Sequence, residues 1–250
     1  MPRPRGEAPA RAPAAPKGMA KKHETMISIA NLKKSYGQTT ACDIESLEVA
    51  DGEIVGIVGN NGAGKTTLFR LMLDLAKPDT GHVTTTPPPH RQTACTAQGP
   101  VDVAGSEEWK LFTGAYLNES FLIDYLTPDE YFAFLAKISG LGTDEMKRNL
   151  ERFEAFDDGE VLGQHKLIRD LSAGNRQKAG IMAAFATSPS VAILDEPFNY
   201  LDPQSQNRLK RVVEEYNRET GATILWVLCL GHEETLVRIA TVDIEPSVMI

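Results

Sequence analysis

The sequence predicts an α/β fold that a helical lobe interrupts. Two observations predict it: short apolar strands alternate with amphipathic helices from Met26 onward, and a run of helical signals separates the first strands from the last. Of the 250 residues, 42% are apolar, which suffices for one sizeable core with a small appended lobe. We therefore expect a single domain over residues 26–250.

Residues 1–25 are predicted to form an unfolded tail. They are rich in Pro, Ala and Arg and show no apolar periodicity, so they offer little apolar surface for burial. The folded part is expected to begin with the strand Ile27 to Ala30.

The strand and helix pattern is clearest on either side of a glycine-rich turn. A short apolar strand at 54–58 runs straight into glycines, and a helix that stops before Pro78 follows at once. The spacing predicts that its buried face consists of Leu68, Leu71, Met72 and Leu75. The Pro- and Thr-rich stretch from Thr84 to Gly99 is interpreted as a surface loop.

The middle of the chain is predicted to be helical. Thr127 can cap a helix whose first turn holds Pro128, and Glu130 completes a capping box. A second helix is expected to carry Met146, Leu150 and Phe153 on one side. The strand and helix alternation then resumes with a strand at Val191 to Leu194, a helix opened by Asp202-Pro203 and a strand at Ile224 to Leu230.

Composition excludes several classes of function. The 34 acidic and 26 basic residues give a net charge of −8, which is the opposite of the basic surface that nucleic-acid binding needs, so no nucleic-acid partner is expected. No apolar run approaches the roughly 20 residues of a membrane-spanning helix. Cys42, Cys95 and Cys229 lie far apart, and their spacing indicates neither a zinc site nor a disulfide framework.

The glycine-rich turn matches the phosphate-binding loop pattern in full, with a strand before it and a helix after it. Its glycines let backbone N–H groups approach phosphate oxygens, which the positive end of the helix also favours. Lys65 would neutralise β- and γ-phosphate charge, and Thr66 would offer its hydroxyl to Mg²⁺. The expected nucleotide site consists of Gly59, Asn60, Asn61, Gly62, Ala63, Gly64, Lys65, Thr66 and Thr67.

A later apolar strand ends in two acids, Asp195 and Glu196. The carboxyl edge of the sheet is where an open α/β fold presents its ligands. Asp195 is expected to hold Mg²⁺ through water, and Glu196 to act as the general base that polarises the water attacking the γ-phosphate.

Between these motifs, a polar turn from Leu171 to Lys178 opens a further helix. Its order and spacing resemble the signature of the ABC ATPase family, Leu-Ser-Gly-Gly-Gln, with matches at Leu171, Ser172 and Gly174. The resemblance covers nearly all of 26–245. It implies a P-loop NTPase fold of the ABC type, with a mostly parallel core sheet, an antiparallel β portion near the N-terminus and an inserted helical subdomain. The implied division is a nucleotide-binding core at 26–116 and 180–250 and a helical subdomain at 117–179.

The resemblance also implies roles for single residues. Tyr36 stands where the family stacks an aromatic ring on adenine, and His232 where the family has a histidine that contacts the γ-phosphate. The loop 199–202 resembles the one that crosses the dimer interface in the family. Glu119 replaces a glutamine that senses Mg²⁺ and the attacking water, and a carboxylate there can still bind the metal. Further departures are Ala173 and Asn175 in the signature and Leu230-Gly231 before the histidine.

The family mechanism implies that ATP is sandwiched between two ATPase subunits, in a homodimer or a pseudo-symmetric dimer. The implied cofactors are ATP and Mg²⁺, and the implied partner is a separate integral membrane permease for an unknown transported substrate. The chain would then be cytoplasmic and peripheral on the inner face of the cell membrane. Three alternatives stay open: an ABC-type ATPase without a transporter, a nucleotide-binding regulator that has lost turnover, and, more distantly, a P-loop kinase.

Overall fold

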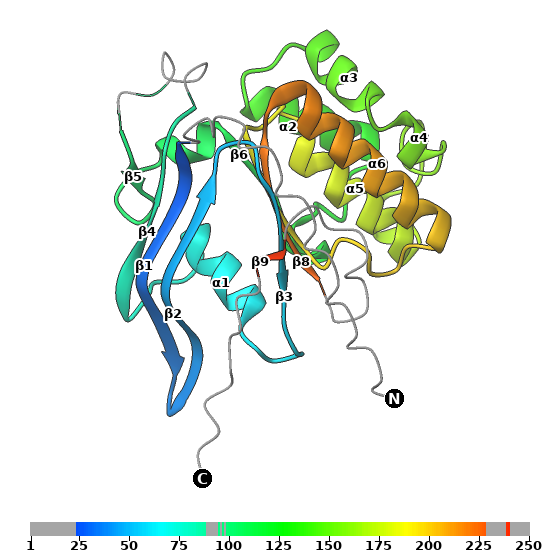
Figure 1. Cartoon of the computed structure of the whole chain (residues 1–250). Helices are drawn as coiled ribbons and strands as arrows, with labels where there is room; N and C mark the ends of the chain where they lie inside the picture. The colour runs from blue at the N-terminus through cyan, green and yellow to red at the C-terminus, as the bar shows by residue number, and fades with distance from the viewer. Residues whose placement is uncertain (1–23, 89–94, 96, 98, 229–238, 241–250) are drawn as a thin grey trace, which may run out of the picture.

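The computed structural model describes residues 24–88, 95, 97, 99–228 and 239–240. Two sheets and a group of helices make up this part of the chain (Figure 1). The first sheet is antiparallel and has the order β2-β1-β4-β5. Its strands are β1 (Thr25–Tyr36), β2 (Thr39–Ala50), β4 (Thr80–Thr85) and β5 (Val101–Asp102).

The second sheet is parallel and has the order β6-β7-β8-β3-β9. Its strands are β3 (Ile54–Val58), β6 (Thr113–Tyr116), β7 (Val191–Asp195), β8 (Thr223–Leu228) and β9 (Ile239–Ala240). The expectation of a mostly parallel core sheet with an antiparallel portion near the N-terminus is confirmed.

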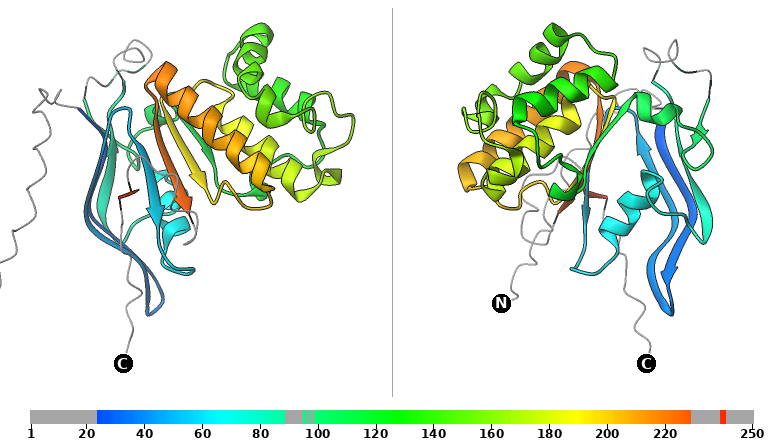
Figure 2. Two further views of the ribbon diagram at one scale, coloured as in Figure 1. Left: turned by 45° about the vertical axis from the view of Figure 1, so that its right-hand side comes forward. Right: turned by 180° about the vertical axis from the view of Figure 1, so that it is seen from behind.

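Helix α1 (Lys65–Met72) lies between the two sheets, as both views of Figure 2 show. Leu68, Phe69 and Leu71 of this helix are buried together with Leu32 of β1 and Ile57 of β3. The helix ends earlier than expected, because Asp74 takes a positive φ of 50° just after it. Leu75 is therefore 53% exposed, and its assignment to the buried face was wrong.

The other helices cover the opposite face of the parallel sheet (Figure 1). They are α2 (Pro128–Ile138), α3 (Thr143–Glu151), α4 (Glu154–Asp157), α5 (Ala173–Phe185) and α6 (Pro203–Thr220). Thr127 and Glu130 form the expected capping box at the start of α2. Phe153, Phe185 and Tyr216 pack ring against ring in the core beneath these helices, with centroid distances of 5.2 and 4.9 Å.

The described residues of the stretch from Thr84 to Gly99 differ from the expected surface loop. Thr84 and Thr85 belong to β4, where they pair with β1 and β5. Pro87, Pro88 and Cys95 are buried, so these described residues do not lie on the surface as expected. Both prolines follow the end of β4, so they remove no hydrogen bond from its ladders.

Helix α5 lies unusually close to β6. A Cβ added at Gly180 of α5 would come within 2.0 Å of the ring of Tyr116, the last residue of β6. The hydroxyl of Tyr116 donates a hydrogen bond of 2.9 Å to Oε1 of Gln177, one helical turn before Gly180. This contact fixes the signature helix relative to the end of the parallel sheet.

We predict that Gly180→Ala destabilises the protein by about 1–3 kcal/mol, because the added methyl group displaces the buried ring of Tyr116. In a helix interior with free space, the same change would stabilise the protein by about 1 kcal/mol. The sign of the stability change therefore shows whether Gly180 packs against Tyr116. Urea unfolding measures it. Gly142→Ala is the control, since no atom lies within 4 Å of a Cβ there and φ is −69°. A neutral or stabilising result for Gly180→Ala would contradict the close packing.

Candidate functional site

The glycine-rich loop between β3 and α1 forms a compact turn around the side chain of Lys65. The ammonium group of Lys65 donates to the carbonyl oxygens of Gly59 and Asn60, at 2.7 and 2.9 Å, and the residue is only 5% exposed. Gly64 precedes the helix with φ at 90°, and a Cβ there would lie 1.7 Å from the carbonyl oxygen of Ala41. Glycine is therefore the residue that this approach to β2 admits.

The first turn of α1 is a suitable place for an anion. No side chain caps this helix N-terminus, whose preceding residue is Gly64. Backbone N–H groups at such an end are free of intrahelical partners and carry partial positive charge. A cavity of about 570 Å³ opens against the loop and is lined by Ala41, Asn61, Gly62, Gly64, Lys65, Thr66, Thr67, Glu196 and Asn199.

The structure brings the acids at the end of β7 to the same place. Oδ2 of Asp195 accepts a hydrogen bond of 2.7 Å from the hydroxyl of Thr66. The other oxygen, Oδ1, is buried and has no hydrogen-bond partner among the described residues. Burial raises the pKa of Asp195, and the nearby charge of Glu196 adds to this, against the lowering effect of Thr66 and Lys65.

These oxygens fit a magnesium ion. Mg²⁺ prefers hard oxygen ligands and is usually held by one or two carboxylates together with substrate phosphates. The buried and unpartnered Oδ1 of Asp195 beside the Thr66 hydroxyl supplies such ligands. Within the described part of the chain, no group of three or more His, Cys, Asp or Glu side chains forms a metal site without phosphates.

Glu196 lies between two cavities. It lines the cavity at the glycine-rich loop and also a second one of about 350 Å³, which Thr66, Glu119 and Asp195 share. Its backbone has a positive φ of 46°, which is strained for a residue other than glycine. Asn199 donates to its carboxylate at 2.6 Å, and Gln177 donates to its carbonyl oxygen at 3.1 Å. Asn199 thus orients the carboxylate, while Gln177 holds the backbone of Glu196.

The turn at Ser172 begins α5 but does not face the glycine-rich loop of the same chain. The Ser172 hydroxyl caps the helix by accepting from the backbone N–H of Asn175. Gly174 approaches the carbonyl oxygen of Tyr200, where an added Cβ would lie 2.8 Å away. Neither Ser172 nor Gly174 lines the cavities at Lys65 and Asp195. Within one chain, these two predicted site residues therefore do not join the residues around Lys65 and Asp195.

The structure places the remaining predicted residues as follows. Glu119 lines the second cavity, and its carboxylate is paired with the guanidinium of Arg176. Tyr36 ends β1 with 52% of its surface exposed and lines neither cavity. His232 lies outside the described residues.

Sequence reasoning missed three residues that support the site. Asn199 orients the Glu196 carboxylate, while Gln177 links the Glu196 backbone to the buried hydroxyl of Tyr116. Burial raises the pKa of Tyr116, so its hydroxyl stays protonated as a donor. Asn199 could have been found from its position three residues after Glu196, but the other two are joined only by tertiary packing.

Comparison with known proteins gives the family. The sequence profile of the ABC transporter family matches residues 42–199. The chain is 32% identical over 206 residues to the bacitracin transport ATP-binding protein BcrA of Enterococcus faecalis, with 80% of this chain and 60% of BcrA covered. It is 30% identical to the tungstate uptake system ATP-binding protein TupC of Peptoclostridium acidaminophilum, with 80% and 85% covered. The chain spans less than two thirds of BcrA.

Solved structures agree with this assignment. An ATP-binding subunit of an ABC transporter superimposes with a TM-score of 0.66 at 25% identity, covering 82% of this chain and 80% of that one. A dimeric bacterial ABC transporter cassette has the same fold, with a TM-score of 0.66 at 22% identity and 81% and 87% covered. The chain belongs to the ABC transporter family of ATP-binding domains.

The raised pKa of Asp195 predicts a pH dependence. An acid whose pKa is higher in the folded than in the unfolded state weakens the fold once it ionises, so this loss grows as pH rises through the raised pKa. Asp195→Asn removes the charge. In urea unfolding, we expect the free energy of unfolding of the variant to rise relative to that of the wild type between about pH 4 and pH 7.

Asp202→Asn is the control of opposite sign. The hydrogen bond from the Ser205 hydroxyl, with backbone N–H groups of α6, lowers the pKa of Asp202 to about 2. Its ionised form stabilises the fold, and this stabilisation is lost as pH falls through that lowered pKa. The control should therefore lose stability relative to the wild type as pH rises from about 2 to about 4, and the difference should then stay nearly constant up to pH 7. A similar loss for Asp195→Asn would show that its charge is favourable.

Proposed function

We propose that the chain binds Mg²⁺ and ATP, hydrolyses the ATP, and thereby powers a separate membrane permease. One observation carries the proposal: the glycine-rich loop around Lys65 and the acids Asp195 and Glu196 line adjoining cavities. A triphosphate site and a water-activating carboxylate are the parts that phosphoryl transfer to water needs.

Each residue has a task in this reaction. The backbone N–H groups of the loop and the ammonium of Lys65 bind the β- and γ-phosphates, with Thr67 following in the first turn of α1. Thr66, Asp195 and Glu119 would hold a Mg²⁺ ion, which would neutralise charge on the phosphates. Glu196, held by Asn199, accepts the proton of the attacking water.

Two further roles follow from the family resemblance. Tyr36 pairs with Thr39 at the turn between β1 and β2, two residues before Ala41, whose carbonyl oxygen meets Gly64 of the glycine-rich loop. Its exposed ring provides a face on which adenine can stack. His232 would contact the γ-phosphate.

A second copy of the ATPase subunit completes the site. Ser172 and Gly174 carry the family signature, yet they line neither cavity of their own chain. A two-fold dimer can place this turn of one subunit over the phosphates of the other. The bacterial ABC transporter cassette of similar fold is a dimer.

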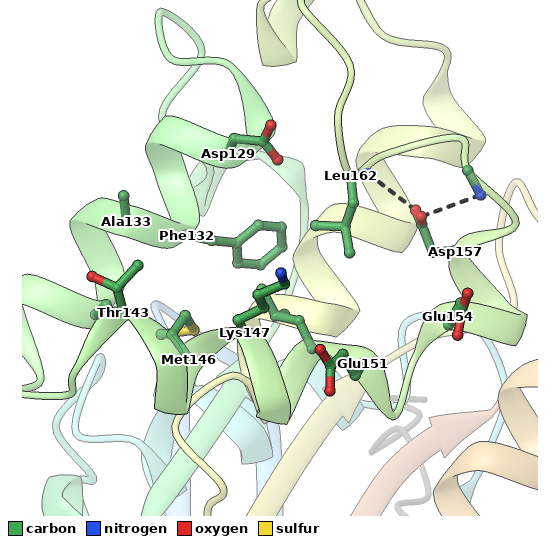
Figure 3. Close-up of a pocket in the computed structure, with 13 residues that line it drawn as sticks. Asp129, Phe132, Ala133, Thr143, Met146, Lys147, Glu151, Glu154, Asp157 and Leu162 are labelled. Carbon is green, nitrogen blue, oxygen red and sulfur yellow. Dashed lines mark hydrogen bonds between the residues drawn. The ribbon is translucent and has the colours of Figure 1, made fainter.

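The membrane partner is proposed to dock on the helical lobe. In the described part of the chain no helix is both long and apolar enough to cross a membrane. A cavity of about 760 Å³ lies between α2, α3 and α4 (Figure 3). Phe132, Met146 and Leu162 form its apolar floor, and Asp129 and Glu151 lie at its edge. This surface suits a short helix with apolar and basic side chains from a permease, on the cytoplasmic face of the membrane.

The relatives do not agree on a cargo. They are named for bacitracin, tungstate and methionine, and they include both uptake systems and a bacitracin transport protein. Substrate and direction therefore belong to the permease and not to this chain.

We predict that Glu196→Gln binds ATP but loses about 10²–10⁴-fold in steady-state phosphate release, because the general base is gone. With Mg²⁺ and ATP this variant should accumulate as a dimer in sedimentation velocity and return to a monomer without nucleotide. Lys65→Ala, which removes the ammonium from the phosphate loop, should neither dimerise nor hydrolyse. If wild-type protein binds ATP without releasing phosphate, the chain is a regulator that has lost turnover.

Docking on the helical lobe predicts the effect of filling its cavity. Ala133→Trp, at an exposed position of α2 on this cavity, should abolish copurification with an integral membrane protein while leaving soluble ATP hydrolysis within about twofold. Ala104→Trp is the matched control, at an exposed turn beyond β5 in the antiparallel layer. Equal retention of the membrane protein by both variants would place the docking surface elsewhere.

A further inference from the structure

Glu119 is the third carboxylate on one small cavity. It lines the cavity of about 350 Å³ together with Asp195 and Glu196, and its side chain is 54% exposed. A polyphosphate bound at Lys65 would bring several further negative charges to this place. Without a nearby positive charge, the carboxylate of Glu119 would repel such a ligand and weaken its binding.

Arg176 compensates this charge from the signature helix. Its Nε donates to Oε2 of Glu119 at 2.8 Å. Its Nη1 donates to the carbonyl oxygens of Arg169 and Leu171, at 3.2 and 3.5 Å. Because these carbonyls belong to the backbone just before α5, the guanidinium is fixed before any ligand arrives, and it is only 26% exposed.

The contact also sets the direction of the carboxylate. Oε2 of Glu119 is engaged by Arg176, whereas Oε1 accepts no hydrogen bond from the described residues. The carboxylate therefore keeps one oxygen for a metal ion or its water while the ion pair neutralises the charge of the group. Lysine would lack this geometry, because only a guanidinium reaches a carboxylate and two carbonyls in one plane.

Arg176 also joins two segments that are distant in sequence. Its backbone N–H donates to the carbonyl oxygen of Ser172 in the first turn of α5, and its side chain holds the loop that follows β6. The residues of the ion pair are 57 positions apart. Arg176 thus connects Glu119 to the turn at Ser172 within one subunit.

We propose that Arg176 is a positioning residue that neutralises and orients Glu119, so that an acid can replace an amide at this place without repelling nucleotide. The proposal rests on ATP binding at Lys65. It extends that function by assigning a role to a residue outside the phosphate loop and the acids of β7.

The test measures the affinity for ATP in EDTA, by fluorescence or calorimetry, for wild type, Arg176→Gln, Glu119→Gln and the double variant. Without Mg²⁺, the uncompensated Glu119 of Arg176→Gln should weaken ATP binding by about tenfold at low salt. The double variant should bind at least fivefold more tightly than Arg176→Gln, by an order-of-magnitude estimate from the same charge. Glu119→Gln alone should bind more tightly than wild type, and all differences should shrink at high salt.

Arg208→Gln is the matched control. Arg208 pairs with Asp158 at nearly the same exposure, 25% and 54%, but lines neither cavity at Lys65. Its removal should leave ATP affinity unchanged.

The outcomes are separable. If wild type fails to bind ATP, the proposed function falls and this inference with it. If wild type binds but Arg176→Gln matches it, or the double variant is as weak as Arg176→Gln, the role of Arg176 is refuted alone. Should Arg176→Gln fail to fold, Glu119→Gln still decides, because affinity equal to or below that of wild type contradicts the charge argument.

Discussion

The hydrogen bonds of the Lys65 ammonium to the carbonyl oxygens of Gly59 and Asn60 organise the site. A buried cation needs such partners, and by satisfying it the loop takes a closed path between β3 and α1. The close approach of Gly64 to the carbonyl of Ala41 then fixes this loop against the antiparallel sheet. The start of α1 is thereby aimed at the same space as the carboxyl ends of the parallel strands. Binding of phosphate and placement of Asp195 are therefore consequences of one local arrangement.

Local patterns predicted much of the fold and the centre of the site. The capping box of Thr127, the cap of α6 by Asp202 and the strand before the phosphate loop depend on neighbouring residues, and all are confirmed. Leu75 was misplaced because helical periodicity alone does not show that the chain turns at Asp74. The burial of Pro87, Pro88 and Cys95 depends on tertiary packing, which composition does not reveal.

The contacts that support the site could not be predicted from the sequence, because they too join residues that are distant along the chain. From the sequence, Glu119 adds negative charge beside a triphosphate. Only the tertiary structure shows that it pairs with Arg176. Ser172 lines neither cavity of its own chain, which is why the proposed function assigns it to the site of a second copy. The division into a core at 26–116 and 180–250 and a helical subdomain at 117–179 is consistent with this view and stays a proposal.

Equilibrium binding of ATP to the purified chain, with Lys65→Ala alongside, tests the central claim most directly. Isothermal titration with Mg²⁺ present should show a saturable site in the wild type, with about one ATP per chain. The Lys65→Ala protein should retain its fold and lose most of that affinity. Equal binding by both proteins, or no binding by either, would contradict a triphosphate site built around this lysine.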